Sequence, residues 1–177
     1  MKLVILDRDG VINHDSDAYI KSPDEWKPIA GSLDAIARLN QAGFHVVIAT
    51  NQSGVGRGLF DMATLNAIHD KMHRALGQAG GRIDAIFYCP HAPEANCRCR
   101  KPRVGMFEDI ARRFNTNLAG VPVIGDTRRD LDAAAALGAA PLLVLTGRGE
   151  QTQNEGGLPQ GTRIYADLAA AVEALAA

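Results

Sequence analysis

The chain has 177 residues, which is the size of one ordinary domain, and 46% of them are hydrophobic. Its 19 basic and 20 acidic residues give a formal net charge of −1, so no overall basic field favours nucleic acid or an anionic membrane. The longest nearly apolar run, residues 133–145, is too short to span a bilayer. We therefore expect one domain over residues 1–177, a monomer in the cytoplasm with no nucleic-acid or membrane partner.

Apolar segments of strand length alternate with amphipathic helical segments along the chain. Strands are predicted at residues 3–6, 44–49, 83–88, 121–124 and 142–145. Helices are predicted at residues 31–42, from Asp61 through a stripe of Leu65, Ile68, Met72 and Leu76, and at 105–114, 130–137 and 167–176. The polar, glycine-rich residues 147–161 are expected to form an exposed loop. Because the strands are apolar throughout, the pattern predicts a Rossmann-like α/β domain, with a parallel sheet covered by helices on both faces and no large cap.

Polar residues collect where the predicted strands end, which is where parallel sheets bind ligands. Asp7 and Asp9 follow the first strand, Thr50 and Asn51 end the second, and Asp126 follows the fourth. Three chain-distant carboxylates at one edge of a sheet repel one another unless a cation lies among them. Oxygen ligands favour a hard ion, and Mg²⁺ is the usual choice when a phosphate completes its coordination.

Four potential metal ligands lie within 11 residues, namely Cys89, His91, Cys97 and Cys99. The chain has no other cysteine, which argues against an extracellular disulfide framework. Two or more thiolates with an imidazole suit tetrahedral Zn²⁺ with all four positions filled, so the small loop 89–99 is predicted to bind a structural zinc ion. The alternative is a set of reduced thiols beside an unrelated histidine. Zinc would fix a loop that lacks a core and leads directly into Arg100 and Lys101.

Four short motifs, in this order, resemble those of the haloacid dehalogenase (HAD)-type phosphatases. They are Asp7-Arg8-Asp9-Gly10, Thr50-Asn51-Gln52, Lys101-Pro102 and Gly125-Asp126, and they extend over most of the chain. A lone Asp-x-Asp would be weak support because acidic loops are common, whereas four ordered motifs are specific. The resemblance implies a Mg²⁺-dependent phosphomonoesterase that works through an aspartyl-phosphate intermediate.

The resemblance also implies a role for each motif residue. Asp7 is the nucleophile, and Thr50 and Lys101 stabilise the phosphoryl group. Asp9 gives a proton to the leaving alcohol and later accepts one from water, which requires a pKa well above the reference value of about 3.9. Asp130 is expected either to cap a helix or to support the metal ligands. The implied Mg²⁺ ligands are Asp7, the backbone carbonyl of Asp9, and Asp126.

Two groups of compact relatives within this family share the Cys/His loop. One group acts on a heptose 1,7-bisphosphate used for lipopolysaccharide precursors, and the other acts on histidinol phosphate. The run from Thr50 to Gly58 is more similar to the first group, although the stretch between His91 and Cys97 is shorter than in many relatives. A small sugar phosphate is therefore the expected substrate, with histidinol phosphate as the alternative.

Matched positions imply a substrate site around the predicted strand ends. Arg100 is expected to recognise the substrate, and Arg57, Arg100 and Arg128 are candidates for a second phosphate, because arginine pairs bidentately with phosphate. The residues expected to line the sugar site are Asp15, Ser16, Asp17, Ala18, Asn51, Gln52 and Ser53.

An alternative from another class is a signalling domain that accepts a phosphoryl group without turning over. Such a domain shares the parallel sheet and the acidic Mg²⁺ pocket. A mere acceptor has no use for a proton donor two residues after its phosphorylated aspartate, so Asp9 favours the enzyme.

Overall fold

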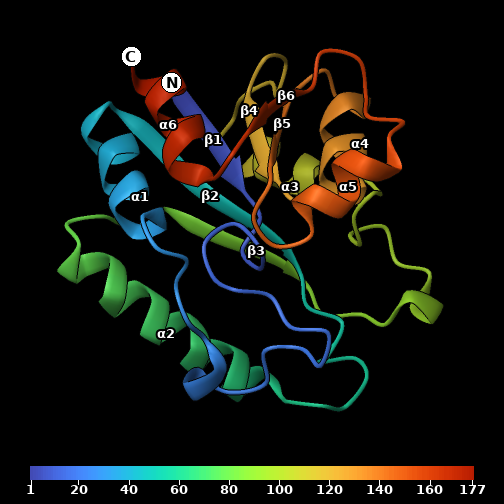
Figure 1. The fold of residues 1–177 in the computed structure, drawn as a ribbon. Helices are drawn as coiled ribbons and strands as arrows, with labels where there is room; N and C mark the ends of the chain where they lie inside the picture. The colour runs from blue at the N-terminus through green and yellow to red at the C-terminus, as the bar shows by residue number, and fades with distance from the viewer.

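Six parallel strands form the centre of the computed structural model, which describes residues 1–177 (Figure 1). The strands lie in the order β3-β2-β1-β4-β5-β6, and every neighbouring pair is parallel. Their bounds are β1 (Lys2–Leu6), β2 (Phe44–Asn51), β3 (Ala85–Cys89), β4 (Pro122–Gly125), β5 (Ala140–Val144) and β6 (Arg163–Tyr165). The predicted α/β class and parallel sheet are confirmed.

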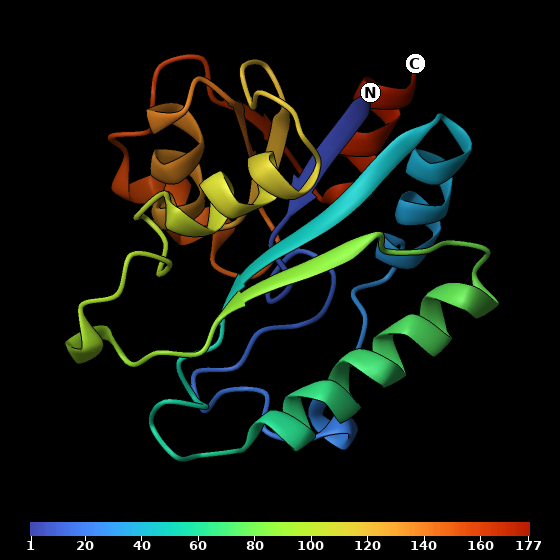
Figure 2. The same cartoon turned by 180° about the vertical axis from the view of Figure 1, so that it is seen from behind.

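Helices cover both faces of this sheet, as the two opposite views show (Figures 1 and 2). One face packs against α1, α2 and α6 in a cluster of 20 buried residues, and the other packs against α3 and α4 in a cluster of 12. In β1, Val4 and Leu6 enter the first cluster while Leu3 and Ile5 enter the second, so both faces need apolar residues. The helices are α1 (Ser32–Gln41), α2 (Met62–Gln78), α3 (Gly105–Arg113), α4 (Arg128–Ala136), α5 (Gly149–Glu155) and α6 (Leu168–Ala176).

The strand order reverses at β1, which lies between β2 and β4. Connections that leave β1 and β4 therefore diverge and open a crevice at the carboxyl ends of these strands. The backbone N–H of Asp7 donates to the carbonyl of Ile124 at 2.9 Å, so the first residue after β1 is held against β4. This contact brings Asp7 and the residues after Gly125 to the same edge of the sheet.

Three long connections, residues 7–31, 52–61 and 90–104, leave the carboxyl ends of β1, β2 and β3. They contain only two short 3-10 turns, η1 (Pro23–Glu25) and η2 (Pro93–Ala95), and no large cap domain. The helices of this protein are all too short or too polar to cross a membrane. The crevice at the edge of the sheet is thus bordered by loops of the same domain.

The structure differs from the sequence prediction after β5. The expected exposed loop over residues 147–161 was wrong for Gly149–Glu155, which form α5. This helix is polar and shows no apolar stripe, and it is attached by the hydroxyl of Thr152, which donates to the carbonyl of Asp126 at 2.7 Å. The short edge strand β6 was not predicted either, because three residues give too little pattern to recognise.

Candidate active site

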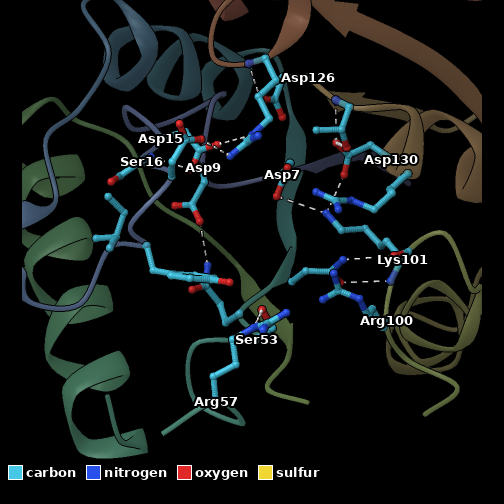
Figure 3. A pocket seen from close by; sticks show the side chains of 18 residues that line it. Asp7, Asp9, Asp15, Ser16, Ser53, Arg57, Arg100, Lys101, Asp126 and Asp130 are labelled. Carbon is cyan, nitrogen blue, oxygen red and sulfur yellow. Dashed lines mark hydrogen bonds and ion pairs between the residues drawn. The ribbon is translucent and has the colours of Figure 1, made fainter. Parts of the chain in front are cut away.

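Three carboxylates from separate parts of the chain meet at the crevice (Figure 3). Asp7 follows β1, Asp126 follows β4, and Asp130 lies in the first turn of α4; one oxygen of each lies within 4.8 Å of the others. Burial raises the pKa of Asp7 well above its ordinary value, and the negative charge of Asp130 raises it further. Burial and Asp130 likewise raise the pKa of Asp126 to about 7. A cation among these oxygens would remove the repulsion that raises both pKa values.

The surroundings of Asp126 fit a hard divalent ion. Its Oδ2 accepts a hydrogen bond from the backbone N–H of Arg148 at 2.9 Å, whereas its buried Oδ1 has no partner. Gly10 has φ +85°, and a Cβ at this position would overlap Asp126 Oδ2, so only glycine leaves room for the Asp126 carboxylate. An unpaired buried carboxylate oxygen beside a second carboxylate is the donor set that Mg²⁺ prefers. The residues present therefore fit the predicted ion.

Lys101 lies between two of these carboxylates. Its Nζ is 2.6 Å from Asp130 Oδ1 and 3.2 Å from Asp7 Oδ1, and it donates to the carbonyl of Ala49 at 2.6 Å. Burial alone lowers the pKa of Lys101, but Asp130 and Asp7 outweigh it and hold the pKa above its ordinary value. Asn51 fixes the backbone of Lys101 from both sides: its Oδ1 accepts from the Lys101 N–H at 3.0 Å, and its Nδ2 donates to the Lys101 carbonyl at 3.2 Å. Lys101 is thus a buried, charged ammonium group directed at Asp7.

Asp130 has two functions that the sequence left open as alternatives. One oxygen, Oδ2, accepts from the backbone N–H and the hydroxyl of Thr127, which precedes α4. The other, Oδ1, accepts from Lys101 Nζ. A Cβ at Gly125 would overlap the Asp130 side chain, so a glycine is required there. Asp130 therefore stabilises the start of α4 and holds Lys101 at the same time.

The environment of Asp9 contradicts the expected pKa. Burial raises the pKa of Asp9, but the charge of Arg8 and hydrogen bonds from Asn13, Arg8 and Gln52 together lower it by more than burial raises it. The net pKa is therefore below its ordinary value. Asp9 Oδ1 accepts from Arg8 and Asn13, and Oδ2 accepts from Gln52 Nε2 at 3.1 Å. The expectation of a raised pKa was wrong for the substrate-free protein because four donors surround the carboxylate. In this state Asp9 is ionised.

A cavity of about 310 Å³ opens in front of these groups. Most residues predicted for the site line it, but Thr50, Ala18 and Arg128 do not. Thr50 is buried and accepts from Gln52 Nε2 at 3.0 Å, and Ala18 lies outside the lining. The cavity is lined by Asp7, Asp9, Asp15, Ser16, Asp17, Tyr19, Ile20, Asn51, Gln52, Ser53, Arg57, Arg100, Lys101, Asp126, Thr127, Arg129, Asp130 and Arg148.

Three arginines line this cavity without a carboxylate partner, namely Arg57, Arg100 and Arg129. Burial lowers the pKa of Arg100, and the charges of Arg129 and Arg57 lower it further. Arg128, the third candidate for a second phosphate, does not line the cavity. It faces away from the cavity and pairs with Asp132 and the carbonyl of Gly156, because α4 directs successive residues to different sides.

Arg148 joins the rim of the cavity to the carboxylate cluster. Its Nε is 2.9 Å from Asp15 Oδ2 and its Nη2 is 2.9 Å from Asp17 Oδ1. Its backbone N–H contacts Asp126, as described above. No sequence pattern pointed to Arg148, since it lies in the segment predicted to be an exposed loop. Its single positive charge faces two carboxylates at the mouth of a cavity that is lined by four other cations, Arg57, Arg100, Lys101 and Arg129.

The predicted zinc ligands lie together in the loop after β3. The Sγ atoms of Cys89 and Cys97 are 3.6 Å apart, and His91 Nδ1 is 3.5 Å from Cys89 Sγ and 3.3 Å from Cys99 Sγ. Ligand atoms around a tetrahedral zinc ion are separated by roughly 3.5–3.8 Å, given the usual zinc–sulfur and zinc–nitrogen bond lengths. All three cysteines are free of disulfides. The four side chains therefore have the spacing of a tetrahedral zinc site.

Two family models match the chain. One, described as HAD-hydrolase-like, matches residues 98–171, and the other, polynucleotide kinase 3 phosphatase, matches residues 2–128. The D-glycero-beta-D-manno-heptose-1,7-bisphosphate 7-phosphatase of Bordetella bronchiseptica is 66% identical over 175 residues, which cover 99% of this chain and 98% of the relative. The chain belongs to the D-glycero-beta-D-manno-heptose-1,7-bisphosphate 7-phosphatase family.

Other members of this family support the same assignment. The Pseudomonas putida relative is 54% identical over 170 residues, covering 96% of this chain and 97% of its own length. A crystal structure of the B. bronchiseptica heptose bisphosphate phosphatase complexed with magnesium and phosphate has a TM-score of 0.98, with 99% of this chain and 98% of that chain covered. The Burkholderia thailandensis enzyme has a TM-score of 0.80 at 54% identity, with 99% and 98% covered. The chain is thus a phosphatase of the HAD hydrolases, as its motifs predicted.

Proposed function

We propose that this phosphatase removes the 7-phosphate of D-glycero-D-manno-heptose 1,7-bisphosphate in the synthesis of lipopolysaccharide precursors. The observation that carries the proposal is a second set of cations in the cavity that holds Asp7 and Lys101. Arg100 lies beside Lys101, and Arg57 lies at the side of the cavity away from Asp126 (Figure 3). A monoester needs only Asp7 and Lys101, whereas a bisphosphate also uses the arginines. The names of the close relatives point to the same substrate.

The first half of the reaction transfers the phosphoryl group to Asp7. A carboxylate oxygen of Asp7 attacks phosphorus, the ester P–O bond breaks, and its electron pair stays with the sugar oxygen. Lys101, held by Asp130 and 3.2 Å from Asp7, is placed to neutralise charge on the phosphoryl oxygens. Thr50, which is buried near the end of β2, is expected to hold the strand end that presents backbone N–H groups to the same oxygens.

Asp9 moves the proton in both halves of the reaction. In the first half it gives a proton to the sugar oxygen as that oxygen leaves. In the second half a water oxygen attacks phosphorus, Asp9 takes the proton, and inorganic phosphate departs from Asp7. The ionised state found without substrate suits the second half. For the first half, the negative charge of an arriving phosphate beside Asp9 opposes its ionisation and favours uptake of a proton.

Mg²⁺ would be held by Asp7, the backbone carbonyl of Asp9, and Asp126. When bound, the ion shields the Asp7 carboxylate from the negative charge of the phosphate and so permits the attack. Magnesium and phosphate together in the crystal structure of the B. bronchiseptica relative support this assignment.

The second phosphate is assigned to Arg57, Arg100 and Arg129. Arg57 is fixed by a hydrogen bond from its Nε to Ser53 Oγ at 3.3 Å and by the ring of Tyr19, whose centroid lies 5.8 Å from the guanidinium carbon. The residues assigned to the sugar hydroxyls are the polar lining residues Asp15, Ser16, Asp17, Asn51, Gln52 and Ser53, together with Ala18, which follows Asp17 in the chain but lies outside the lining.

Zn²⁺ is assigned a structural role at Cys89, His91, Cys97 and Cys99. The carbonyl of Cys89 accepts from the N–H of Gln52 at 2.8 Å, and the carbonyl of Pro90 accepts from the N–H of Gly56 at 2.7 Å. The loop is thus connected to the segment that carries Arg57, and it leads into Arg100. Thiol ligands need to stay reduced, which accords with a location in the cytoplasm. The enzyme is further proposed to act as a monomer of one domain.

Initial rates with Mg²⁺ over a set of phosphate esters test the proposal. We expect turnover of the heptose 1,7-bisphosphate with loss of the 7-phosphate, and weak turnover of histidinol phosphate. Arg100→Ala should raise KM for the bisphosphate far more than KM for a simple monoester, because only the bisphosphate carries a second phosphate for Arg100 to bind. Equal effects on both esters contradict the second-phosphate assignment. A single turnover followed by arrest would instead show a phospho-acceptor domain.

A further inference from the structure

A buried network holds the side chain of Asp9. Arg8, which is fully buried, donates through Nε and Nη2 to Asp9 Oδ1 at 3.0 and 2.8 Å. Its remaining terminal nitrogen, Nη1, lies 3.1 Å from Nε2 of His69. His69 belongs to α2, a helix from which no residue lines the cavity. The network therefore connects a distant helix to the proposed proton-transfer group.

His69 acts as an acceptor in this contact. An arginine side chain has only donors, so His69 Nε2 must accept and the ring must be neutral with its proton on Nδ1. Burial lowers the pKa of His69 to about 3, and the charge of Arg8 contributes to this. His69 is 7% exposed and stands in the buried stripe of α2, where the other members are Leu65, Ile68, Met72 and Leu76. Packing alone gives no reason for a polar residue there.

The two oxygens of Asp9 have unequal surroundings. Oδ1 receives three donors, two from Arg8 and one from Asn13 Nδ2 at 2.9 Å. Oδ2 receives one donor, Gln52 Nε2 at 3.1 Å, and Asp9 lines the cavity. An oxygen that already accepts three hydrogen bonds has no lone pair to offer a proton. Oδ2 is therefore the oxygen that exchanges the proton with substrate and water.

We propose that His69 is a positioning residue for proton transfer, because it orients Arg8, which in turn fixes Asp9 with Oδ2 free to face the ester oxygen. The inference rests on the proposed function, in which Asp9 protonates the leaving oxygen. As the ester P–O bond breaks, its electron pair stays on the leaving oxygen, and the proton on Oδ2 moves to that oxygen. A side chain at position 69 that accepts no hydrogen bond leaves Arg8 Nη1 unpaired and frees Arg8 to turn away from Asp9.

The experiment compares two leaving groups in His69→Leu and His69→Gln. The heptose bisphosphate has a basic alkoxide leaving group that needs a proton, whereas p-nitrophenyl phosphate has a weakly basic one that does not. We expect His69→Leu to lower kcat/KM for the bisphosphate about 10- to 100-fold, because kcat/KM reports the first half of the reaction, in which the ester oxygen leaves. Its kcat/KM with p-nitrophenyl phosphate should stay within about threefold of wild type. Glutamine retains an acceptor at this distance, so His69→Gln should restore both rates.

Two further variants separate positioning from folding. Met72→Ala removes packing on the same face of α2 but takes no hydrogen bond from Arg8, and it should lower the melting temperature while the ratio of the two rates stays at the wild-type value. His69→Asn, whose side chain is too short to reach Arg8, repeats the leucine test with a polar residue if leucine does not fold. Equal losses for both esters in His69→Leu or His69→Asn, or no loss for either, overturn the proposal. If the wild-type protein hydrolyses neither ester, the proposed function itself fails.

Discussion

The carboxylate cluster and the Cys/His loop are both candidate metal sites, but the chain builds them in different ways. Asp7 and Asp126 extend from the ends of buried strands, and Lys101 and Asp130 are 2% and 1% exposed. In the loop 89–99 only Cys89 is buried, and the backbone hydrogen bonds within it are confined to the η2 turn. The fold therefore holds the first site in place before an ion binds, whereas we expect the second to depend on an ion to hold its loop.

The largest expected effect is on the preformed site. Asp7→Asn should lower turnover of every phosphate ester by at least about 10⁴-fold, because the amide is not a nucleophile toward phosphorus. The melting temperature should not fall, since the substitution removes one of three mutually repelling carboxylates. Steady-state rates and thermal unfolding check both expectations, and a residual rate within 100-fold of wild type contradicts the role of Asp7.

Lys101→Met tests how strongly the preformed site depends on its buried cation. The substitution leaves Asp130 buried without its ionic partner, which typically costs about 3–5 kcal/mol of unfolding free energy. The matched double variant Lys101→Met/Asp130→Asn should recover most of this stability, since the buried charge of Asp130 is removed together with its partner, but it should recover no activity. Denaturant unfolding and initial rates measure the two quantities separately. Recovery of activity in the double variant is incompatible with charge neutralisation by Lys101.

Removal of zinc tests the Cys/His loop, the second of the two candidate metal sites. Chelation, or Cys97→Ser, should make residues 90–100 sensitive to protease and lower activity by about 10- to 100-fold through Arg100 and Lys101. Added Mg²⁺ should not restore this activity. Removal of Mg²⁺ should stop turnover without exposing the loop to protease. If both treatments expose the loop equally, the contrast between the two sites is wrong.

A smaller effect is expected on the pH dependence of stability, through the buried network of His69, Arg8 and Asp9. The unfolded chain binds a proton at His69 below about pH 6.5, whereas the folded chain does so only near pH 3. The unfolded state therefore takes up more protons as the pH falls through this window, and stability is lost from about pH 6.5 downward. Between pH 7 and pH 5 the loss should be about 2 kcal/mol more in wild type than in His69→Gln. Unfolding curves with the same pH dependence in both proteins exclude a neutral buried His69.

The comparison also explains what the sequence could predict. The strands are continuous apolar runs and the motif residues follow them directly, so local patterns located Asp7, Asp126 and the Cys/His loop. Contacts that join distant segments left no such pattern. Arg8 meets His69 from 61 positions away, and Arg148 meets Asp15 from 133 positions away.

Local patterns also could not predict the protonation state of a buried side chain or the direction in which a helical side chain points. The raised pKa expected for Asp9 came from its proposed role, and the donors that lower this pKa are visible only in the folded protein. The choice between Arg128 and Arg129 depends on one helical step of about 100°, which the start of α4 at Arg128 determines. The sequence had placed the start of this helix at Asp130.

The central claim is that Asp7 becomes phosphorylated during turnover. The most direct measurement is acid quenching of the enzyme within its first turnovers on the heptose bisphosphate, followed by peptide mass spectrometry. We predict a phosphoryl group on the peptide that contains Asp7, absent in Asp7→Asn. It should accumulate in Asp9→Asn with p-nitrophenyl phosphate, whose leaving group needs no acid, because this variant lacks the base for the second half. Full turnover with unmodified Asp7 at every quench time, or a phosphoryl group on another residue, would contradict the account.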